Sequence, residues 1–213
     1  MKLNRVIKFL ILSDVALIAG FGLVSPIFAI FLSDNIKGGG VEIAGFAAAI
    51  YWIIESIIVI PAGRYLDRNH GEKDDLWFII IGNLLAGIAI IGYIYSSLPW
   101  HIYALQALYA IGMGMNIPGY SAIFTRHIDK GKEASEWGIR SSSIGFCTGV
   151  AGACGGIIVK KFGFDALFVG SAAFVIASSV IPLLVRKNMS PKNIPVTKVP
   201  AVKTIHPPIG KDE

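Results

Sequence analysis

Six long apolar runs constrain this chain more than any other feature of its sequence. They lie at roughly 7–32, 41–62, 76–97, 100–124, 138–159 and 165–185. Each holds about 20 residues or more, which as an α-helix is enough to cross a hydrocarbon core about 30 Å thick. The mean hydropathy of +0.65 and a charged fraction of 15% leave too little polar surface for a soluble domain. We therefore expect an all-α membrane protein with six transmembrane helices.

The same runs argue against transmembrane strands and against a cleaved leader. None shows the ten-residue alternation of a barrel strand, and unpaired backbone cannot face lipid. The first run is too long for a signal peptide, carries Asp14 and lacks a small-residue cleavage pattern. We expect one transmembrane domain over 1–187. The Pro and Lys content of 188–213 predicts a disordered cytoplasmic tail.

The net charge of +5 is explained by membrane topology. With the N-terminus in the cytoplasm, only Lys37, Lys160 and Lys161 of the 19 Lys and Arg residues fall on the outer side. This bias predicts that both termini are cytoplasmic, in a bacterial-type inner membrane whose lipid surrounds the helices. No nucleic-acid-binding motif interleaves the basic residues, so we expect no nucleic-acid partner.

The sequence carries no recognisable catalytic or metal-binding pattern. Ser-His-Asp and Cys-His arrangements, metal-ligand spacings and a phosphate loop are all missing from it. Cys147 and Cys154 lie seven residues apart on one predicted helix, about 10 Å along its axis, which is too far for a disulfide. We expect no enzyme, no cofactor and no metal.

Two acidic residues lie within the apolar runs and are candidates for a proton or substrate site. Asp14 is in the first run and Glu55 in the second. A carboxylate in the bilayer costs about 2.5–3.5 kcal/mol on insertion scales, so such residues face a cavity or a partner. Either they carry protons or bind a cation, or they form a structural ion pair with Arg140 or Arg64 or line a wet cavity. Arg140 either extends outward to the interface or pairs with a buried acid.

The fourth run adds further polar candidates, Gln106, Asn116 and Tyr120. These side chains either line a cavity or, in part, belong to an ordinary helix-packing stripe.

The segment between the second and third runs resembles the loop signature of major facilitator superfamily transporters, Gly-x-Leu-x-Asp-Arg-x-Gly-Arg-Lys. Gly63, Asp67 and Arg68 match it in spacing, Gly71 comes one residue late, and Glu72 stands where a basic residue is usual. The resemblance implies that Asp67 and Arg68 form charge contacts with a facing half at the cytoplasmic side, which favour one state of a transport cycle. The alternative is a charged cytosolic turn.

The fifth run holds a stripe of glycines, Gly145, Gly149, Gly152 and Gly156, spaced for close helix packing. The superfamily has a Gly-Pro-x-x-Gly-Gly signature in this helix. Residues 151–156 keep the terminal Gly pair and lack the Gly-Pro pair. Because that signature is associated with antiporters, its loss weakens an antiport interpretation.

A weak internal echo relates the first and fourth runs. Gly22 precedes Pro26 by four residues, and Gly114 precedes Pro118 by four, with Ile-Phe following in each case. These runs cross the membrane in opposite directions, so the echo indicates a three-plus-three inverted repeat, although two such short matches also arise by chance.

The resemblance extends over roughly 7–187 and implies one half of such a transporter, similar to the N-terminal half. Because these transporters usually carry twelve spans, we expect function to depend on pairing. The prediction is a secondary active transporter of a small solute, with the proton as a candidate coupling ion. It would work by alternating access as a parallel homodimer. The alternatives are a non-transporting membrane interaction or scaffold subunit, and one half of a heteromeric transporter.

Overall fold

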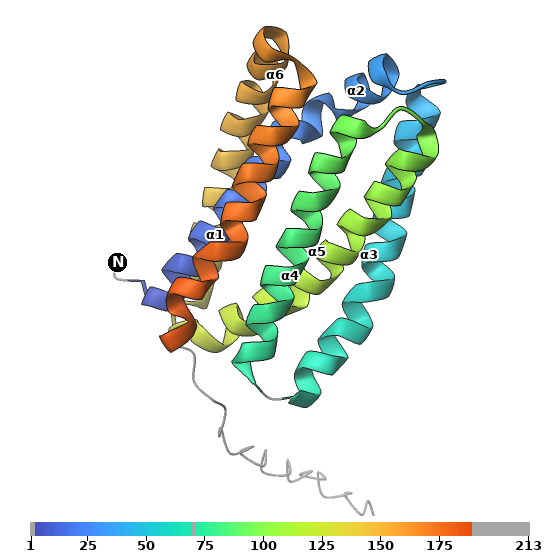
Figure 1. Ribbon diagram of the computed structural model, residues 1–213. Coiled ribbons are helices and arrows are strands. Elements are labelled where there is room, and N and C mark those ends of the chain that lie inside the picture. Colours follow the sequence, from blue (N-terminus) through green and yellow to red (C-terminus); the bar gives the residue numbers. More distant parts are fainter. Residues whose placement is uncertain (1–2, 70, 189–213) are drawn as a thin grey trace, which may run out of the picture.

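The computed structural model describes residues 3–69 and 71–188, and these form a bundle of long helices (Figure 1). The elements are α1 (Arg5–Val24), η1 (Ser25–Ile27), α2 (Phe28–Asn35), α3 (Val41–Asn69), α4 (Glu72–Gly92), η2 (Tyr93–Tyr95), α5 (Pro99–His127), α6 (Glu133–Val180) and η3 (Ile181–Asn188). The prediction of an all-helical fold is confirmed for this part of the chain. The predicted tail, 188–213, lies outside the described residues apart from Asn188.

The longest element, α6, consists of two helical legs. Gly163 interrupts the helix with φ 81° and ψ 178°, a left-handed φ that favours glycine because it has no Cβ. Figure 1 shows both legs descending from one turn at the top of the bundle. We call 133–162 the first leg and 164–180 the second leg. They correspond to the fifth and sixth predicted spans.

Four helical stretches are long and apolar enough to cross a membrane, judged by length and composition over the described residues: Arg5–Asn35, Val41–Arg68, Glu72–Tyr95 and Glu133–Arg186. The last contains both legs of α6. The fourth predicted span, 100–124, forms α5 but is not among them, because Gln106, Asn116 and Pro118 reduce its apolar content. The structure therefore supports the helices that were predicted without establishing six spans.

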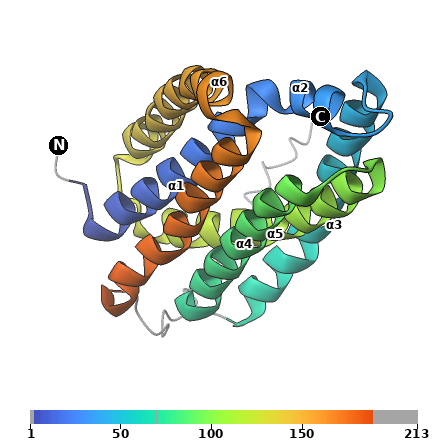
Figure 2. The same ribbon diagram turned by 45° about the horizontal axis from the view of Figure 1, so that its top comes forward.

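The helices pack as two groups that meet along α4 and α6. In the first group α1 lies between the two legs of α6, as Figure 2 shows from above. In the second group α5 packs against both α3 and α4. The approach of α4 to α5 depends on Gly82 and Gly112, since a Cβ on either residue would collide with the carbonyl oxygen of the other.

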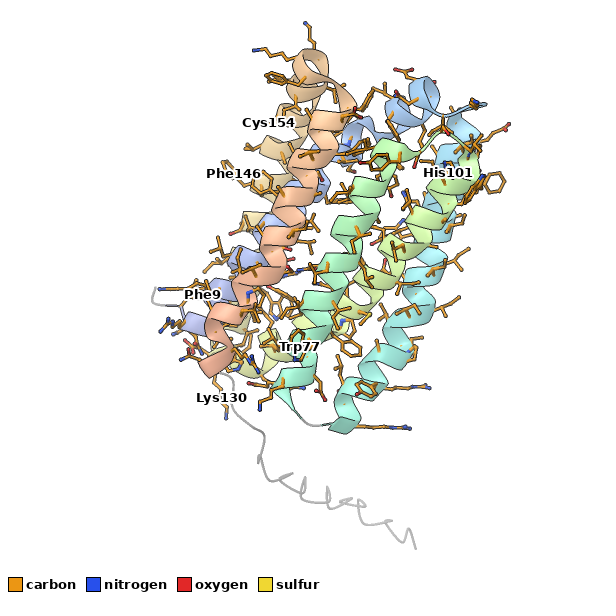
Figure 3. The ribbon with its side chains drawn as sticks, in the orientation of Figure 1. Phe9, Trp77, His101, Lys130, Phe146 and Cys154 are labelled. Carbon is orange, nitrogen blue, oxygen red and sulfur yellow. The ribbon has the colours of Figure 1, made fainter. Side chains whose placement is uncertain are left out.

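Two apolar cores fill the bundle, one at each end. One core contains Phe31, Tyr93 and Phe168. The other contains Ile7, Leu76 and Phe124. In Figure 3 Lys130 and His101 mark opposite ends of the bundle. We call the end near Lys130, where α1 and α4 begin and α3 and α5 end, the basic end.

The echo between the first and fourth runs does not extend to local structure. Pro26 is the second residue of the 3-10 turn η1, which separates α1 from α2. In contrast, α5 continues as a helix through Pro118. The inverted repeat thus stays a prediction.

Candidate functional site

A buried ion pair connects α1 with the first leg of α6. Arg140 Nη2 lies 2.7 Å from Asp14 Oδ2, and the Asp14 side chain is only 7% exposed. The Arg140 guanidinium also lies over the rings of Tyr120 and Trp137, 4.7 and 5.4 Å from their centroids. Of the two alternatives for Arg140, the structure has the one in which it pairs with a buried acid. Tyr120 belongs to this cluster and contacts the cation.

Glu55 is a second buried acid, on α3 against α5. It is 8% exposed, and its backbone carbonyl would lie 3.3 Å from a Cβ on Gly114 of α5. The Tyr51 side chain, one turn earlier on α3, interacts electrostatically with the Glu55 side chain. The Oε2 atom of Glu55 has no hydrogen-bond partner among the described residues. No arginine neutralises this carboxylate in that part of the chain.

The two acids belong to separate clusters. Asp14 interacts electrostatically with Arg140 and Tyr120. Glu55 interacts instead with Tyr51 and Tyr109. They share no partner among the described residues, so one copy of the chain does not bring them into a single carboxylate pair.

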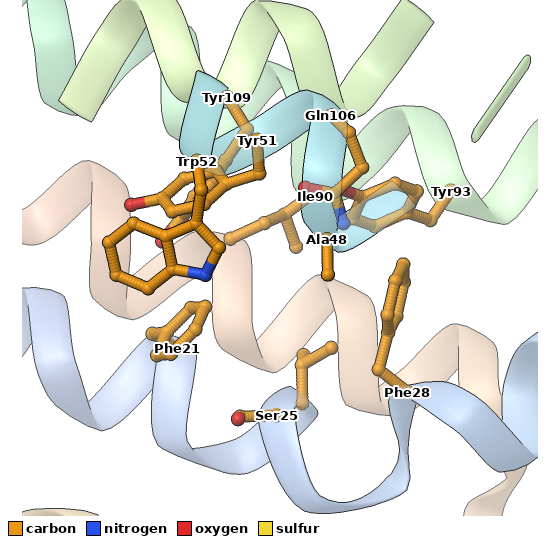
Figure 4. Close-up of a pocket in the computed structure, with 11 residues that line it drawn as sticks. Phe21, Ser25, Phe28, Ala48, Tyr51, Trp52, Ile90, Tyr93, Gln106 and Tyr109 are labelled. Atoms are coloured by element: carbon orange, nitrogen blue, oxygen red, sulfur yellow. The ribbon is translucent and has the colours of Figure 1, made fainter. Parts of the chain in front are cut away.

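An aromatic cavity of about 170 Å³ opens between α1 and the α3–α5 group, in the half of the bundle away from the basic end. Its lining comes from α1, η1, α2, α3, α4, η2 and α5, and Figure 4 shows most of these side chains around the cavity. The lining residues are Phe21, Val24, Ser25, Phe28, Ala48, Tyr51, Trp52, Ile90, Tyr93, Gln106 and Tyr109. Of the polar candidates predicted on the fourth run, Gln106 lies in this cavity, whereas Asn116 and Tyr120 do not.

Asn116 belongs to a buried chain of hydrogen bonds that connects four helices. Its Nδ2 donates to Asn83 Oδ1 on α4 at 2.7 Å, and Asn83 Nδ2 donates to Ser178 Oγ on the second leg at 2.9 Å. Ser13 Oγ on α1 donates to the Ser178 carbonyl at 2.7 Å. Each of these side chains is at most 5% exposed. These hydrogen bonds hold the two helix groups together, so Asn116 has a structural role.

A second set of charges lies at the basic end, between the start of α4 and the end of α5. Arg126 forms an ion pair with the fully buried Asp75, and His127 Nε2 lies 3.1 Å from Glu72 Oε1. Acids in the first turn of α4 and bases in the last turn of α5 also suit the helix dipoles. In the loop that follows, a hydrogen bond from Lys132 to Asp129 raises the pKa of that lysine.

The residues of the predicted gate lie at the end of α3 and in the short connection that follows. The helix continues through the signature to Asn69, so Asp67 and Arg68 occupy a helical end and not a turn. Both are exposed, and neither forms an ion pair with another described residue. Gly63 faces α5, where its Cβ would lie 3.8 Å from Pro118, and Gly71 is the extended residue that caps α4.

The glycine stripe of the first leg makes less contact within this chain than the sequence predicts. A Cβ on Gly152 would lie 3.3 Å from Pro26 Cγ, but one on Gly145, Gly149 or Gly156 would meet nothing within 4 Å. Gly155, which lies one residue off the stripe, makes the close approach to α1. The reason is the rotation of the leg, which leaves Gly145, Gly149 and Gly156 exposed.

A sequence profile decides the family. The profile described as Major Facilitator Superfamily matches residues 10–209. The chain belongs to the major facilitator superfamily. It is therefore a multi-pass membrane protein, in agreement with its apolar helices. No curated protein matches the chain.

Two solved structures of this superfamily share the fold. The crystal structure of the POT family transporter PepTSo matches with a TM-score of 0.72 and 20% identity, over 100% of this chain and 40% of that one. An auto-inhibited POT family peptide transporter matches with a TM-score of 0.68 and 20% identity, over 90% of this chain and 39% of that one. At this identity the likeness concerns the fold alone. The chain spans about 40% of the length of these transporters.

The polar groups described above lie within the helices of a membrane protein of this superfamily. Within the described residues no group of three His, Cys, Asp or Glu side chains could hold a metal ion. The candidate site residues are the Asp14–Arg140 pair and Glu55, and the candidate ligand site is the aromatic cavity. Sequence analysis missed Asn83 and Ser178, although an Asn within an apolar run is itself a signal of a buried polar contact.

Proposed function

We propose that this chain is one six-helix unit of a secondary active transporter, built as a three-plus-three inverted repeat, and that a second copy completes the carrier as a parallel homodimer. The observation that carries the proposal is the match of the whole chain to 40% of a transporter with a TM-score of 0.72. If the transport path lies between two such units, a single unit needs a second one to enclose it. Two copies inserted with the same orientation are related by a twofold axis along the membrane normal.

The outward surface of α3 is compatible with either lipid or a protein partner on that side. In the most apolar stretch of this helix, only 17% of the residues are buried. Its exposed side chains include Trp52, Ile53 and Ile57, each more than half exposed. Lipid can cover large apolar groups of this kind, so this helix alone does not require a protein partner.

The first leg of α6 supports a protein partner more specifically. Gly145, Gly149 and Gly156 leave open space, and Ser141 and Ser142 are also exposed. Lipid tails gain little against such a small and polar surface, whereas a second helix gains close backbone contact there. We assign this surface to the second copy.

The exposed motif supports a gate between the copies. Asp67 and Arg68 carry charge at the basic end and have no ion-pair partner among the described residues. In a twofold dimer they would contact the other copy in one state and separate in another. Alternating access then follows from rocking of one copy against the other, with both termini on the cytoplasmic side of a bacterial-type inner membrane.

The buried acids support coupling to a proton or to a cation. Asp14 is held by Arg140, and a change in that pair between states would release or take up a proton. Glu55, with one oxygen unpartnered, is the stronger candidate for a ligand contact. The substrate is a small solute in this proposal.

Two other assignments fit the same fold. A heteromeric carrier would place a different six-helix unit against the first leg of α6. A non-transporting scaffold subunit would use that surface to hold a larger membrane protein. The homodimer is preferred because the exposed glycine surface packs most closely against another helix surface of small residues, and a second copy of the chain provides one.

The experiment tests the surface directly. Gly149→Leu should weaken association of two differently labelled copies in lipid vesicles, measured by energy transfer as the lipid-to-protein ratio rises. Gly170→Leu is the matched control, because Gly170 lies in the second leg and also has open space around a Cβ. Unchanged energy transfer in Gly149→Leu would remove this surface from the proposed interface.

A further inference from the structure

The aromatic cavity has the composition of a site for a small organic cation. Six of its lining residues are aromatic, namely Phe21, Phe28, Tyr51, Trp52, Tyr93 and Tyr109. The faces of such rings carry negative potential and attract a cation that is positioned over them. No Lys, Arg or His is among the lining residues, so nothing basic opposes a positive ligand inside the cavity.

The rings are arranged as walls around a space, and not as one stacked column. Phe21 stacks on Tyr109, with centroids 5.9 Å apart and planes at 12°. Tyr51 meets Trp52 edge to face at 79°. Figure 4 shows rings from α1, α2, α3, η2 and α5 facing the same space. A compact ligand within it would therefore contact ring faces from several sides.

Glu55 adds a negative charge behind two of these rings. Its side chain interacts electrostatically with Tyr51 and with Tyr109. The residue is 8% exposed, and its Oε2 atom has no partner among the described residues. Glu55 is not itself among the lining residues, so its charge would act on a cation in the cavity from behind Tyr51 and Tyr109. A buried carboxylate is stabilised by a cation nearby.

The size of the cavity limits the ligand. Drug-sized sites measure about 300–1,000 Å³, and an apolar cavity of about 150 Å³ admits a molecule the size of benzene. At about 170 Å³ the aromatic cavity suits a compact ammonium ion with small alkyl groups. Trp52, which is 63% exposed, stands at its mouth.

We propose that the aromatic cavity binds small organic ammonium ions, held by ring faces and by the negative charge of Glu55. This proposal rests on the proposed function only in that the bound cation would be the transported solute.

The test compares choline with 3,3-dimethyl-1-butanol, a neutral analogue of the same shape. Calorimetric titration of the full chain in lipid nanodiscs, with empty nanodiscs as the blank, should show choline binding at least tenfold more tightly. Trp52→Leu should weaken choline binding about fivefold to thirtyfold, and Glu55→Gln should weaken it while leaving the neutral analogue unchanged. Trp100→Leu, at a residue that is 62% exposed and outside the lining, should leave both ligands unchanged.

Two results would overturn the proposal. One is equal binding of choline and its neutral analogue, and the other is choline binding that stays unchanged in Trp52→Leu or in Glu55→Gln. Because Trp52 is largely exposed, its replacement removes the ring without opening the core, so a folding defect does not obscure the result. These outcomes concern binding to one copy. Failure of the binding test would not decide whether two copies assemble, because energy transfer and native mass spectrometry measure that assembly separately.

Discussion

Asp14→Asn should destabilise the bundle by about 2–3 kcal/mol. Removing one member of a buried ion pair costs about 3–5 kcal/mol, because the other charge stays buried without compensation. Here the Arg140 side chain keeps 26% exposure, and the rings of Tyr120 and Trp137 lie within 5.4 Å of its guanidinium carbon. Each ring retains about 0.5–1 kcal/mol for the cation, which lowers the expected loss.

Reversible unfolding in mixed micelles, followed by tryptophan fluorescence, measures this loss. A double-mutant cycle with Arg140→Gln should give a coupling free energy of at least about 1 kcal/mol, since the two residues are in direct contact. The exposed Asp34→Asn is the control and should change stability by less than about 0.5 kcal/mol. If Asp14→Asn matches that control, or if the two substitutions are simply additive, the pair does not hold α1 to α6.

Three further substitutions test the packing and the gate. Asn83→Leu leaves the buried Asn116 amide without its acceptor and removes the hydrogen bond to Ser178 Oγ, so it should cost about 2–4 kcal/mol in the same unfolding assay. The exposed Asn35→Leu should cost little. Gly112→Ala should cost about 1–3 kcal/mol because its Cβ meets α4, whereas Gly45→Ala, with open space, should be neutral or stabilising. Asp67→Asn should change cysteine labelling at the cytoplasmic mouth without reducing expression, and unchanged labelling would make the motif a simple helix end.

The sequence predicts the helices well because lipid leaves few alternatives. Long apolar runs become helices when every backbone group must be satisfied within the segment. The turn between the fifth and sixth runs is equally local, since Gly163 takes a left-handed φ. The prediction is weakest for α5, where polar residues and Pro118 lie within one run and composition alone does not distinguish a span from a shielded helix.

Contacts between distant helices could not be predicted from local patterns. The position of Asp14 in an apolar run indicates that it needs a partner, but both Arg140 and Arg64 were compatible with that role. The choice depends on how α1 lies between the two legs of α6. In the same way, the glycine spacing identifies a smooth stripe without saying which helix faces it, and most of that stripe turns away from the rest of the chain.

The mass of the assembled particle tests the central claim most directly. Native mass spectrometry of the wild-type chain, released from lipid nanodiscs under gentle activation, should show particles of two copies, each of 22.8 kDa. The two-copy species should persist as the protein is diluted into excess lipid. A single copy under those conditions, with substrate still moving across reconstituted vesicles, would contradict the proposal that a second copy completes the carrier.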